Sequence, residues 1–173
     1  KFYFSGNTDE VYGDKLRGES KETDALRPSS PYSASKAAAE MLCMSASRTY
    51  GFPVLITRSC NNFGIGQHKE KLIPHSIQTL LERKEIDIYG DGKNIREWIS
   101  VIDNCILIFN NSMDTKWIEK NKLKIVNIGS GYRLNNIQMA KKIISLFGYG
   151  KIRFVEDRKG HDRRYALKAN KIE

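Results

Sequence analysis

The feature that most constrains the fold is an apolar, β-rich run at residues 54–59, which follows a long helical stretch. This run, Val-Leu-Ile-Thr-Arg-Ser, is typical of a buried parallel strand. The preceding residues 31–50 predict a helix, because Ser30 can cap it, Pro31 suits its first turn and Gly51 ends it. A short aromatic run at residues 1–5 predicts an earlier strand. The order strand, loop, helix, strand predicts a right-handed crossover in a parallel sheet, and therefore an α/β fold.

The rest of the chain continues the alternation less regularly. Apolar periodicity predicts helices at residues 71–84, after Ser100 to residue 109, and at 135–147. Short strands are expected at residues 86–89, 124–128 and 152–155, and residues 14–28 read as a loop. The sequence Gly-Asp-Gly at residues 90–92 reads as a hairpin turn.

Composition narrows the class of protein. The chain has 173 residues, of which 40% are apolar and 28% charged, as in a soluble globular protein. No apolar run approaches the ~20 residues of a membrane helix, so no membrane partner is expected. The net charge of +9 suits nucleic acid, anionic lipid or an anionic small ligand. The cations are spread along the chain without interleaved aromatics, which argues against nucleic acid and for phosphate groups on a small substrate.

The three cysteines, Cys43, Cys60 and Cys105, are widely spaced and odd in number. No ligand spacing accompanies them, so neither a zinc site, nor any other metal site, nor a disulfide framework is expected. We interpret them as buried small hydrophobes in a reducing compartment, the cytoplasm.

A tyrosine and a lysine, Tyr32 and Lys36, lie four residues apart on the predicted helix and therefore on one face. An ammonium group lowers the pKa of a nearby phenol, which would make Tyr32 a general base for an alcohol. The pair alone is weak evidence, because an exposed tyrosine and lysine on an ordinary helix look the same.

A polar cluster, Thr8-Asp9-Glu10, follows the first strand and the turn signal Ser5-Gly6-Asn7. Ligands bind at the carboxyl ends of strands in open parallel sheets. Two adjacent carboxyl groups in different environments can give and take protons, one protonated and the other ionised. The dipeptide alone favours a solvated acidic turn over a catalytic pair.

Together these motifs carry a resemblance. The chain resembles the extended short-chain dehydrogenase/reductase superfamily and, within it, the nucleotide-sugar 4,6-dehydratases of the dTDP-glucose type. The matching segments are T-D-E-V-Y-G (8–13), P-Y-S-A-S-K-A-A-A-E (31–40), T-R-S-C-N-N-F-G (57–64), E-K-L-I-P (70–74), Y-G-D-G-K-N-I-R-E-W (89–98), N-I-G (127–129) and D-R-K-G-H-D-R-R-Y-A (157–166).

The resemblance implies catalytic roles for Thr8–Glu10 and for the pair Tyr32 and Lys36. NAD takes a hydride from C4 of the sugar while Tyr32 takes the proton of the 4-hydroxyl group. Lys36 lowers the pKa of Tyr32 and holds the nicotinamide ribose, and Thr8 hydrogen-bonds the forming ketone. Glu10 then removes the C5 proton, and Asp9 protonates the departing 6-hydroxyl group.

The resemblance also implies the binding residues. It places Asn62 beside the nicotinamide and the nucleotide-diphosphate sugar against Thr8, Asn61, Lys71, Leu72, Tyr89, Arg96, Asn136, His161 and Arg163. Without the surrounding motifs, Arg96 and Arg163 favour surface salt bridges over ligand binding. It implies a homodimer through helices that include residues 33–50.

The same resemblance predicts the domain organisation. Residues 1–67 form the C-terminal part of a Rossmann-type parallel sheet with the catalytic residues. Residues 68–173 form mainly a smaller α+β substrate-binding domain, with residues of about 99–128 returning to the sheet. Relatives carry a glycine-rich cofactor loop and further strands ahead of the point matching Lys1. We therefore expect a C-terminal fragment of a longer enzyme, inactive without its N-terminal half.

Four residues depart from the family pattern: Asn7, Phe63, Ile65 and Lys69. They leave loop geometry and the choice of nucleotide open. Two alternatives remain, a related dehydratase or epimerase of UDP-sugars and a catalytically silent fragment that binds nucleotide sugars.

Overall fold

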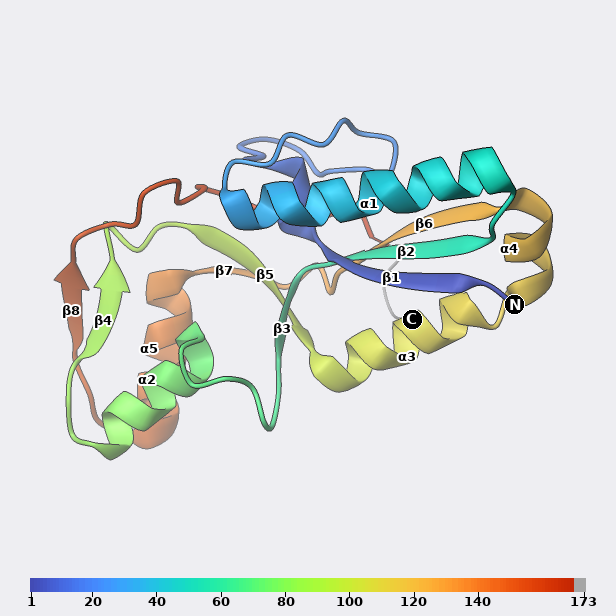
Figure 1. The fold of residues 1–173 in the computed structure, drawn as a ribbon. Helices are drawn as coiled ribbons and strands as arrows, with labels where there is room; N and C mark the ends of the chain where they lie inside the picture. Colours follow the sequence, from blue (N-terminus) through green and yellow to red (C-terminus); the bar gives the residue numbers. More distant parts are fainter. Residues whose placement is uncertain (170–173) are drawn as a thin grey trace.

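The computed structural model describes residues 1–169 of the chain and confirms the α/β class. Its main sheet contains three parallel strands in the order β1 (Tyr3–Thr8), β2 (Val54–Ser59) and β6 (Leu123–Ile128). Helix α1 (Pro31–Tyr50) lies over one face of this sheet and α3 (Val101–Ser112) over the other (Figure 1). The pairing of β6 with β2 brings a late segment of the chain into the first sheet.

Local sequence explains α1 and β2. Ser30 and Ser33 form a capping box at the start of α1, Pro31 occupies the first turn, and Gly51 ends the helix in the left-handed conformation. All six residues of β2 are buried, as expected of a strand covered on both faces.

Strand β1 differs from the prediction in two ways. It continues through Gly6 and Asn7 to Thr8, where a turn was expected, because its register with β2 runs from Tyr3 to Thr8. It is also less buried than expected. Tyr3 and Phe4 are exposed because β1 lies at the edge of the three strands.

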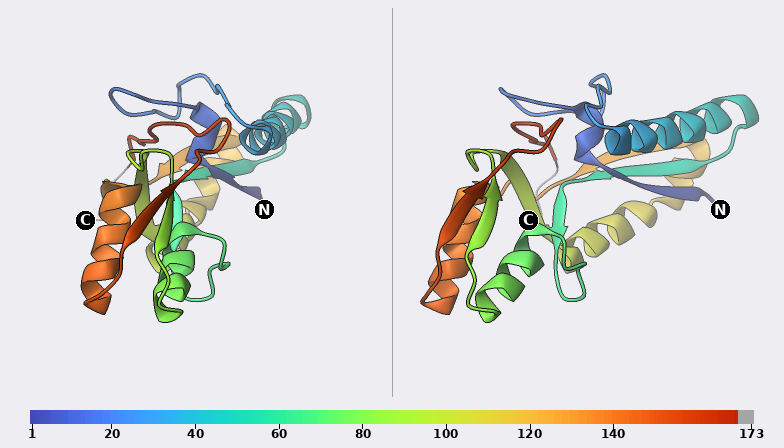
Figure 2. Two further views of the ribbon diagram at one scale, coloured as in Figure 1. Left: turned by 90° about the vertical axis from the view of Figure 1, so that its left-hand side faces the viewer. Right: turned by 60° about the vertical axis from the view of Figure 1, so that its left-hand side comes forward.

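A second group of elements packs beside the sheet (Figure 2). Strand β4 (Ile86–Tyr89) pairs in parallel with β8 (Ile152–Val155), and helices α2 (Leu72–Leu81) and α5 (Asn136–Phe147) pack against each other. A separate apolar core joins them, formed mainly by Leu80, Ile86, Ile88, Trp98, Met139, Ala140 and Ile143.

Three short strands link the two groups: β3 (Asn61–Phe63), β5 (Ile95–Ser100) and β7 (Arg133–Asn135). These strands, like the short helix α4 (Thr115–Asn121), were not predicted because they are short or carry many polar residues. Residues 90–92 form a turn, but the predicted hairpin is wrong. Strand β4 pairs with β8, whereas β5 pairs with β3 and β7.

After β8, residues 156–169 form an irregular strap that returns to the first sheet (Figure 2). Isolated bridges connect it to Ile95 and Ser20. This return brings the predicted binding residues of the strap close to the ends of β1 and β2.

The cysteines are all free, but their burial varies. Cys60 is buried, Cys43 is half-buried and Cys105 is exposed, so the prediction of burial is wrong for Cys105. No helix within residues 1–169 is long and apolar enough to cross a membrane. The same residues contain no group of three or more potential His, Cys, Asp or Glu metal ligands.

Candidate active site

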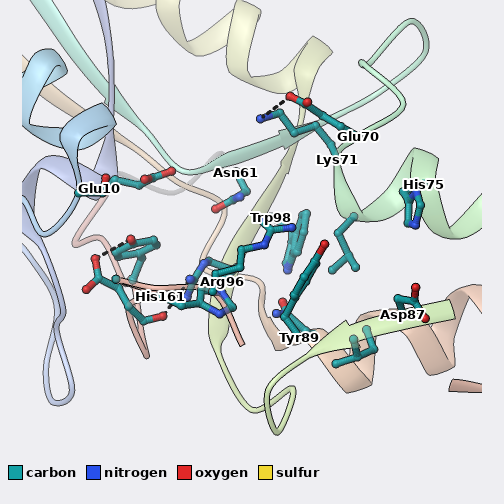
Figure 3. A pocket seen from close by; sticks show the side chains of 18 of the residues that line it. Glu10, Asn61, Glu70, Lys71, His75, Asp87, Tyr89, Arg96, Trp98 and His161 are labelled. Atoms are coloured by element: carbon teal, nitrogen blue, oxygen red, sulfur yellow. Dashed lines mark hydrogen bonds and ion pairs between the residues drawn. The ribbon is translucent and has the colours of Figure 1, made fainter. Parts of the chain in front are cut away.

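A cavity of about 810 Å³ lies between the two groups of elements, at the carboxyl ends of β1 and β2 (Figure 3). Glu10 follows β1 and borders it from one side, while Asn61 follows β2. Residues of α2, β4 and the strap close the other sides. This is the edge of a parallel sheet at which the sequence predicted a ligand site.

The residues Thr8–Glu10 lie where β1 passes into the 3₁₀ helix η1 (Asp9–Tyr12). They are called the catalytic triplet here after the role that the sequence predicts for them. The Thr8 hydroxyl caps this helix by accepting a hydrogen bond from the Glu10 amide at 3.3 Å. Gly13 ends η1 with a φ of 70°, and a Cβ atom there would lie 2.1 Å from the carbonyl oxygen of Arg27. Only glycine fits this position, which explains the last residue of the first motif.

Asp9 is buried, with 2% of its surface exposed. Its Oδ1 accepts a hydrogen bond from Thr8 at 3.3 Å, and Oδ2 has no partner among residues 1–169. Burial, helped by the charge of Glu10 and opposed by Arg96, raises the pKa of Asp9 to about 8. Asp9 therefore holds a proton at neutral pH and can donate it.

Glu10 points into the cavity (Figure 3). Burial raises its pKa, and the positive charge of Arg96 opposes that rise. Glu10 is thus a carboxyl group beside a binding cavity, placed to accept a proton from a bound molecule.

Tyr32 and Lys36 lie on one face of α1, and 56% of the Tyr32 surface is exposed. The Lys36 ammonium donates to the carbonyl of Gly6 at 2.9 Å. The pKa of Tyr32 is raised by burial and by the charges of Glu10 and Asp9, opposite to the lowering expected from Lys36. The structure nevertheless brings Tyr32 within electrostatic range of the catalytic triplet.

Arg96 is the main buried cation of the cavity wall. One terminal nitrogen donates to the Asp162 carbonyl at 2.9 Å, the other to the Ile95 carbonyl at 2.9 Å, and the guanidinium lies 4.3 Å from the centre of the Tyr165 ring. A fixed guanidinium of this kind suits a phosphate ligand, and the exposed Lys71 adds a second positive charge.

The predicted binding residues divide into two groups. Those that line the cavity are Asn61, Asn62, Lys71, Leu72, Tyr89, Arg96, Asn136 and His161. Thr8 and Arg163 are not part of the lining. Arg163 donates two hydrogen bonds of 2.7 Å to the Asp91 carboxylate. In this structure Arg163 therefore forms a surface salt bridge, which was the alternative to a binding role.

Comparison with known proteins gives the family. Residues 1–129 match the model of the NAD dependent epimerase/dehydratase family. The chain belongs to this family. Its first sheet, its catalytic triplet and its Tyr32–Lys36 helix all lie within the matched region.

Several members of this family are similar to the chain over nearly its whole length. It is 47% identical to the low-salt glycan biosynthesis protein Agl12 of Haloferax volcanii, over 95% of the chain and 52% of the relative. It is 39% identical to a dTDP-glucose 4,6-dehydratase of Streptomyces griseus, over 96% of the chain and 50% of that enzyme.

A solved family structure agrees with these two sequences. The crystal structure of the dTDP-glucose 4,6-dehydratase DesIV from Streptomyces venezuelae superposes with a TM-score of 0.87 at 40% identity, covering 96% of the chain and 51% of DesIV. The chain therefore spans about half the length of the relatives it matches.

The residues present fit the nicotinamide part of the cofactor named by the family. Asn62 lines the cavity, and its Oδ1 is buried without a partner among residues 1–169. A buried acceptor of this kind needs a donor, such as the amide of a bound ligand. The exposed Tyr32 and the half-buried Lys36 offer a hydroxyl and an ammonium group on one face of α1.

Several residues of the cavity lining were not among the predicted site residues, and they include His75, Asp87, Trp98 and Asp162. Asp162 accepts hydrogen bonds from the hydroxyl groups of Ser29 and Tyr165, so it ties the strap to the start of α1. Asp162 and Trp98 lie within the matching motifs, which could have drawn attention to them. His75 and Asp87 carry no sequence signal.

Proposed function

We propose that this chain carries the catalytic residues of an NAD-dependent nucleotide-sugar 4,6-dehydratase, which converts dTDP-glucose to dTDP-4-keto-6-deoxyglucose. One observation carries the proposal: Asp9, whose pKa burial raises to about 8, is buried directly beside Glu10, which borders a polar cavity. Elimination of water needs one group that takes a proton from carbon and one that gives a proton to the leaving hydroxyl. The two relatives from Streptomyces are dTDP-glucose 4,6-dehydratases, and this supports dTDP-glucose as the substrate.

The first step is oxidation of the sugar at C4. The cofactor, which Lys36 and Asn62 would hold, would supply a positive charge and a reversible hydride acceptor for this chemistry. The phenolate oxygen of Tyr32 accepts the proton of the 4-hydroxyl group. This step requires the positive charges of Lys36 and of the bound cofactor to offset the rise in the Tyr32 pKa that burial, Glu10 and Asp9 cause. The Thr8 hydroxyl hydrogen-bonds the forming ketone. Lys36, held by the Gly6 carbonyl, binds the cofactor on the same helix face as Tyr32.

The second step is loss of water across C5 and C6. The 4-ketone acidifies the C5–H bond, so that Glu10 can take this proton. Asp9 gives its proton to the 6-hydroxyl group, which leaves as water. Glu10 returns a proton to C5 when C6 is reduced, so Glu10 ends the cycle as it began. Asp9 regains from solvent the proton that left with the water, and Tyr32 releases to solvent the proton that it took from the 4-hydroxyl group.

The cavity binds the nucleotide-diphosphate part. Arg96 and Lys71 provide positive charge for the diphosphate, while Asn61, Asn136 and His161 provide hydrogen-bonding groups. Leu72 and Tyr89 give apolar and aromatic surface. Arg163 would have to leave Asp91 to reach a ligand, and we assign it a binding role only on that condition.

The test is turnover by the full-length enzyme. Incubation with dTDP-glucose should yield the absorbance that 4-keto-6-deoxy sugars develop in alkali, and UDP-glucose should give a weaker signal. A stronger signal with UDP-glucose would favour the UDP-sugar alternative. Absence of signal with both substrates would refute the dehydratase.

We further propose a cytoplasmic homodimer formed through helices that include Ser33–Tyr50. Exposed apolar surface on α1, where Leu42 is 70% exposed, supports the dimer. The three free cysteines support a reducing compartment such as the cytoplasm. Leu42→Glu should produce a monomer in sedimentation of the full-length enzyme. Leu146→Glu, at a site that is 83% exposed on α5, is the matched control and should leave the dimer intact.

A further inference from the structure

A buried hydrogen-bond network lies behind the catalytic triplet, and none of the steps above uses it. It begins at Asn7, which immediately precedes the triplet and is 9% exposed. The Asn7 Oδ1 accepts a hydrogen bond from the Thr8 amide at 2.9 Å, and its Nδ2 donates to Glu40 Oε2 at 2.7 Å and to the Lys36 carbonyl at 3.3 Å. One carboxamide thus connects the triplet to α1.

The far end of this connection is rigid. Glu40 is fully buried, and Arg58, itself 2% exposed, donates from Nε to both carboxylate oxygens at 3.1 Å. A buried carboxylate needs such a partner, and the paired guanidinium fixes its orientation. The network therefore gives the Asn7 amide a fixed acceptor.

The same arginine reaches the other end of the triplet. Arg58 Nη1 donates to the hydroxyl of Tyr12, the last residue of η1, which in turn donates to Asn127 at 2.7 Å. The segment from Thr8 to Tyr12 is consequently held at both ends by one buried ion pair.

Helix geometry shows what this fixes. Lys36 precedes Glu40 by one turn of α1, and Tyr32 precedes it by two turns, so the three side chains share a face. A contact that holds Glu40 to Asn7 also sets the position of Tyr32 and Lys36 relative to the catalytic triplet.

We infer that Asn7 is a positioning residue, which with the Glu40–Arg58 pair sets the placement of the triplet against Tyr32 and Lys36. This inference rests on the proposed function. The carboxamide of Asn7 carries its acceptor and its donor on two different atoms, so one side chain contacts the triplet and α1 at the same time.

The test is Asn7→Asp in the full-length enzyme. The introduced carboxylate keeps the acceptor for the Thr8 amide, but it loses the donor and places a like charge beside Glu40. We expect kcat to fall at least about tenfold while KM changes less than about threefold, because misplacement affects the reacting groups more than the diphosphate contacts. Asn110→Asp, at an exposed position of α3, is the matched control and should change neither.

Adding Glu40→Gln to Asn7→Asp reverses the polarity of the contact, because the introduced amide can donate to the introduced carboxylate. We expect the double variant to have a higher kcat than Asn7→Asp, with at least about half of the decrease in log kcat recovered. No recovery would overturn the inference. If Asn7→Asp does not fold, Asn7→Ser is the milder variant and should lower kcat with the same sparing of KM.

Hydrogen–deuterium exchange separates this inference from the proposed function, because it needs no turnover. Amides of residues 8–13 should exchange faster in Asn7→Asp and slow again in the double variant. Unchanged exchange together with unchanged kcat would overturn the inference. An unaltered enzyme without dehydratase activity would instead refute the proposed function, and the exchange of residues 8–13 would still decide whether Asn7 holds the triplet.

Discussion

Asp9 and Glu10 are neighbours in the chain, but their carboxyl groups lie in different surroundings. Asp9 is buried behind the cavity with an Oδ2 that has no partner within residues 1–169, whereas Glu10 borders the cavity near the positive charge of Arg96. Burial raises the pKa of both groups, and the rise is the larger for Asp9, to about 8. The pair therefore divides into a proton donor and a proton acceptor near neutral pH.

The raised pKa of Asp9 predicts a pH-dependent stability. Between pH values of about 4 and 8 the folded protein holds a proton that the unfolded chain has released, so the free energy of unfolding falls as the pH rises through this range. One group contributes a slope of at most about 1.4 kcal/mol per pH unit. Asp9→Asn should remove this contribution, as measured by urea unfolding at several pH values.

Asp24→Asn is the matched control for this measurement. A hydrogen bond from Lys15 lowers the pKa of Asp24, so its contribution is present above a pH of about 4 and is lost only at lower pH. This variant should retain the decline between pH 4 and 8. An unchanged decline in Asp9→Asn would contradict the assigned protonation.

Glu10→Gln should abolish removal of the C5 proton, since the amide cannot accept it. We expect kcat to fall about 10²- to 10⁴-fold, and deuterium from the solvent should no longer enter C5 of the product. Mass spectrometry of the product in D₂O measures this directly. Glu85→Gln, at an exposed position outside the cavity, should incorporate deuterium normally. Normal incorporation in Glu10→Gln would exclude Glu10 as the base.

Arg96→Gln should affect both binding and the base. The guanidinium opposes the rise in the pKa of Glu10 that burial causes, so its loss should move the acidic limb of the pH profile of kcat/KM to higher pH. Loss of a diphosphate contact should also raise KM, by about tenfold or more. Steady-state kinetics from pH 5 to 9 would show both effects. Arg83→Gln removes an exposed arginine beside Tyr149 and should show neither.

Gly13→Ala should destabilise the protein by several kcal/mol, because the new methyl group would meet the Arg27 carbonyl in a left-handed backbone conformation. Gly18→Ala is the control, since Gly18 has a similar φ of 71° but nothing within 4 Å of the position that a methyl group would take. The destabilisation by Gly18→Ala should stay at about 1 kcal/mol. Thermal unfolding distinguishes the two, and equal losses would show that the Arg27 contact is unimportant.

The sequence alone predicted the elements whose structure is local. Helix α1 carries its own cap, first-turn proline and terminal glycine, and β2 is apolar enough to be buried wherever it lies. The same holds for the motif residues, because Tyr32 and Lys36 lie on one face of any helix. Thr8–Glu10 lie at the end of a predicted strand, although that strand extends further than expected and includes Thr8. By contrast, the short strands β3, β5 and β7 exist only through pairing with one another, so local sequence did not reveal them.

Tertiary structure decided the chemistry of the same residues. Two adjacent carboxyl groups became different only because one is buried and the other borders a cavity. The Lys36 ammonium donates a hydrogen bond to the Gly6 carbonyl, and the Arg163 guanidinium donates to the Asp91 carboxylate. Both contacts join segments that are distant in the sequence. A pKa depends on burial and on charges brought together by folding. The sequence therefore determined which groups are available, and their packing determined which one holds the proton.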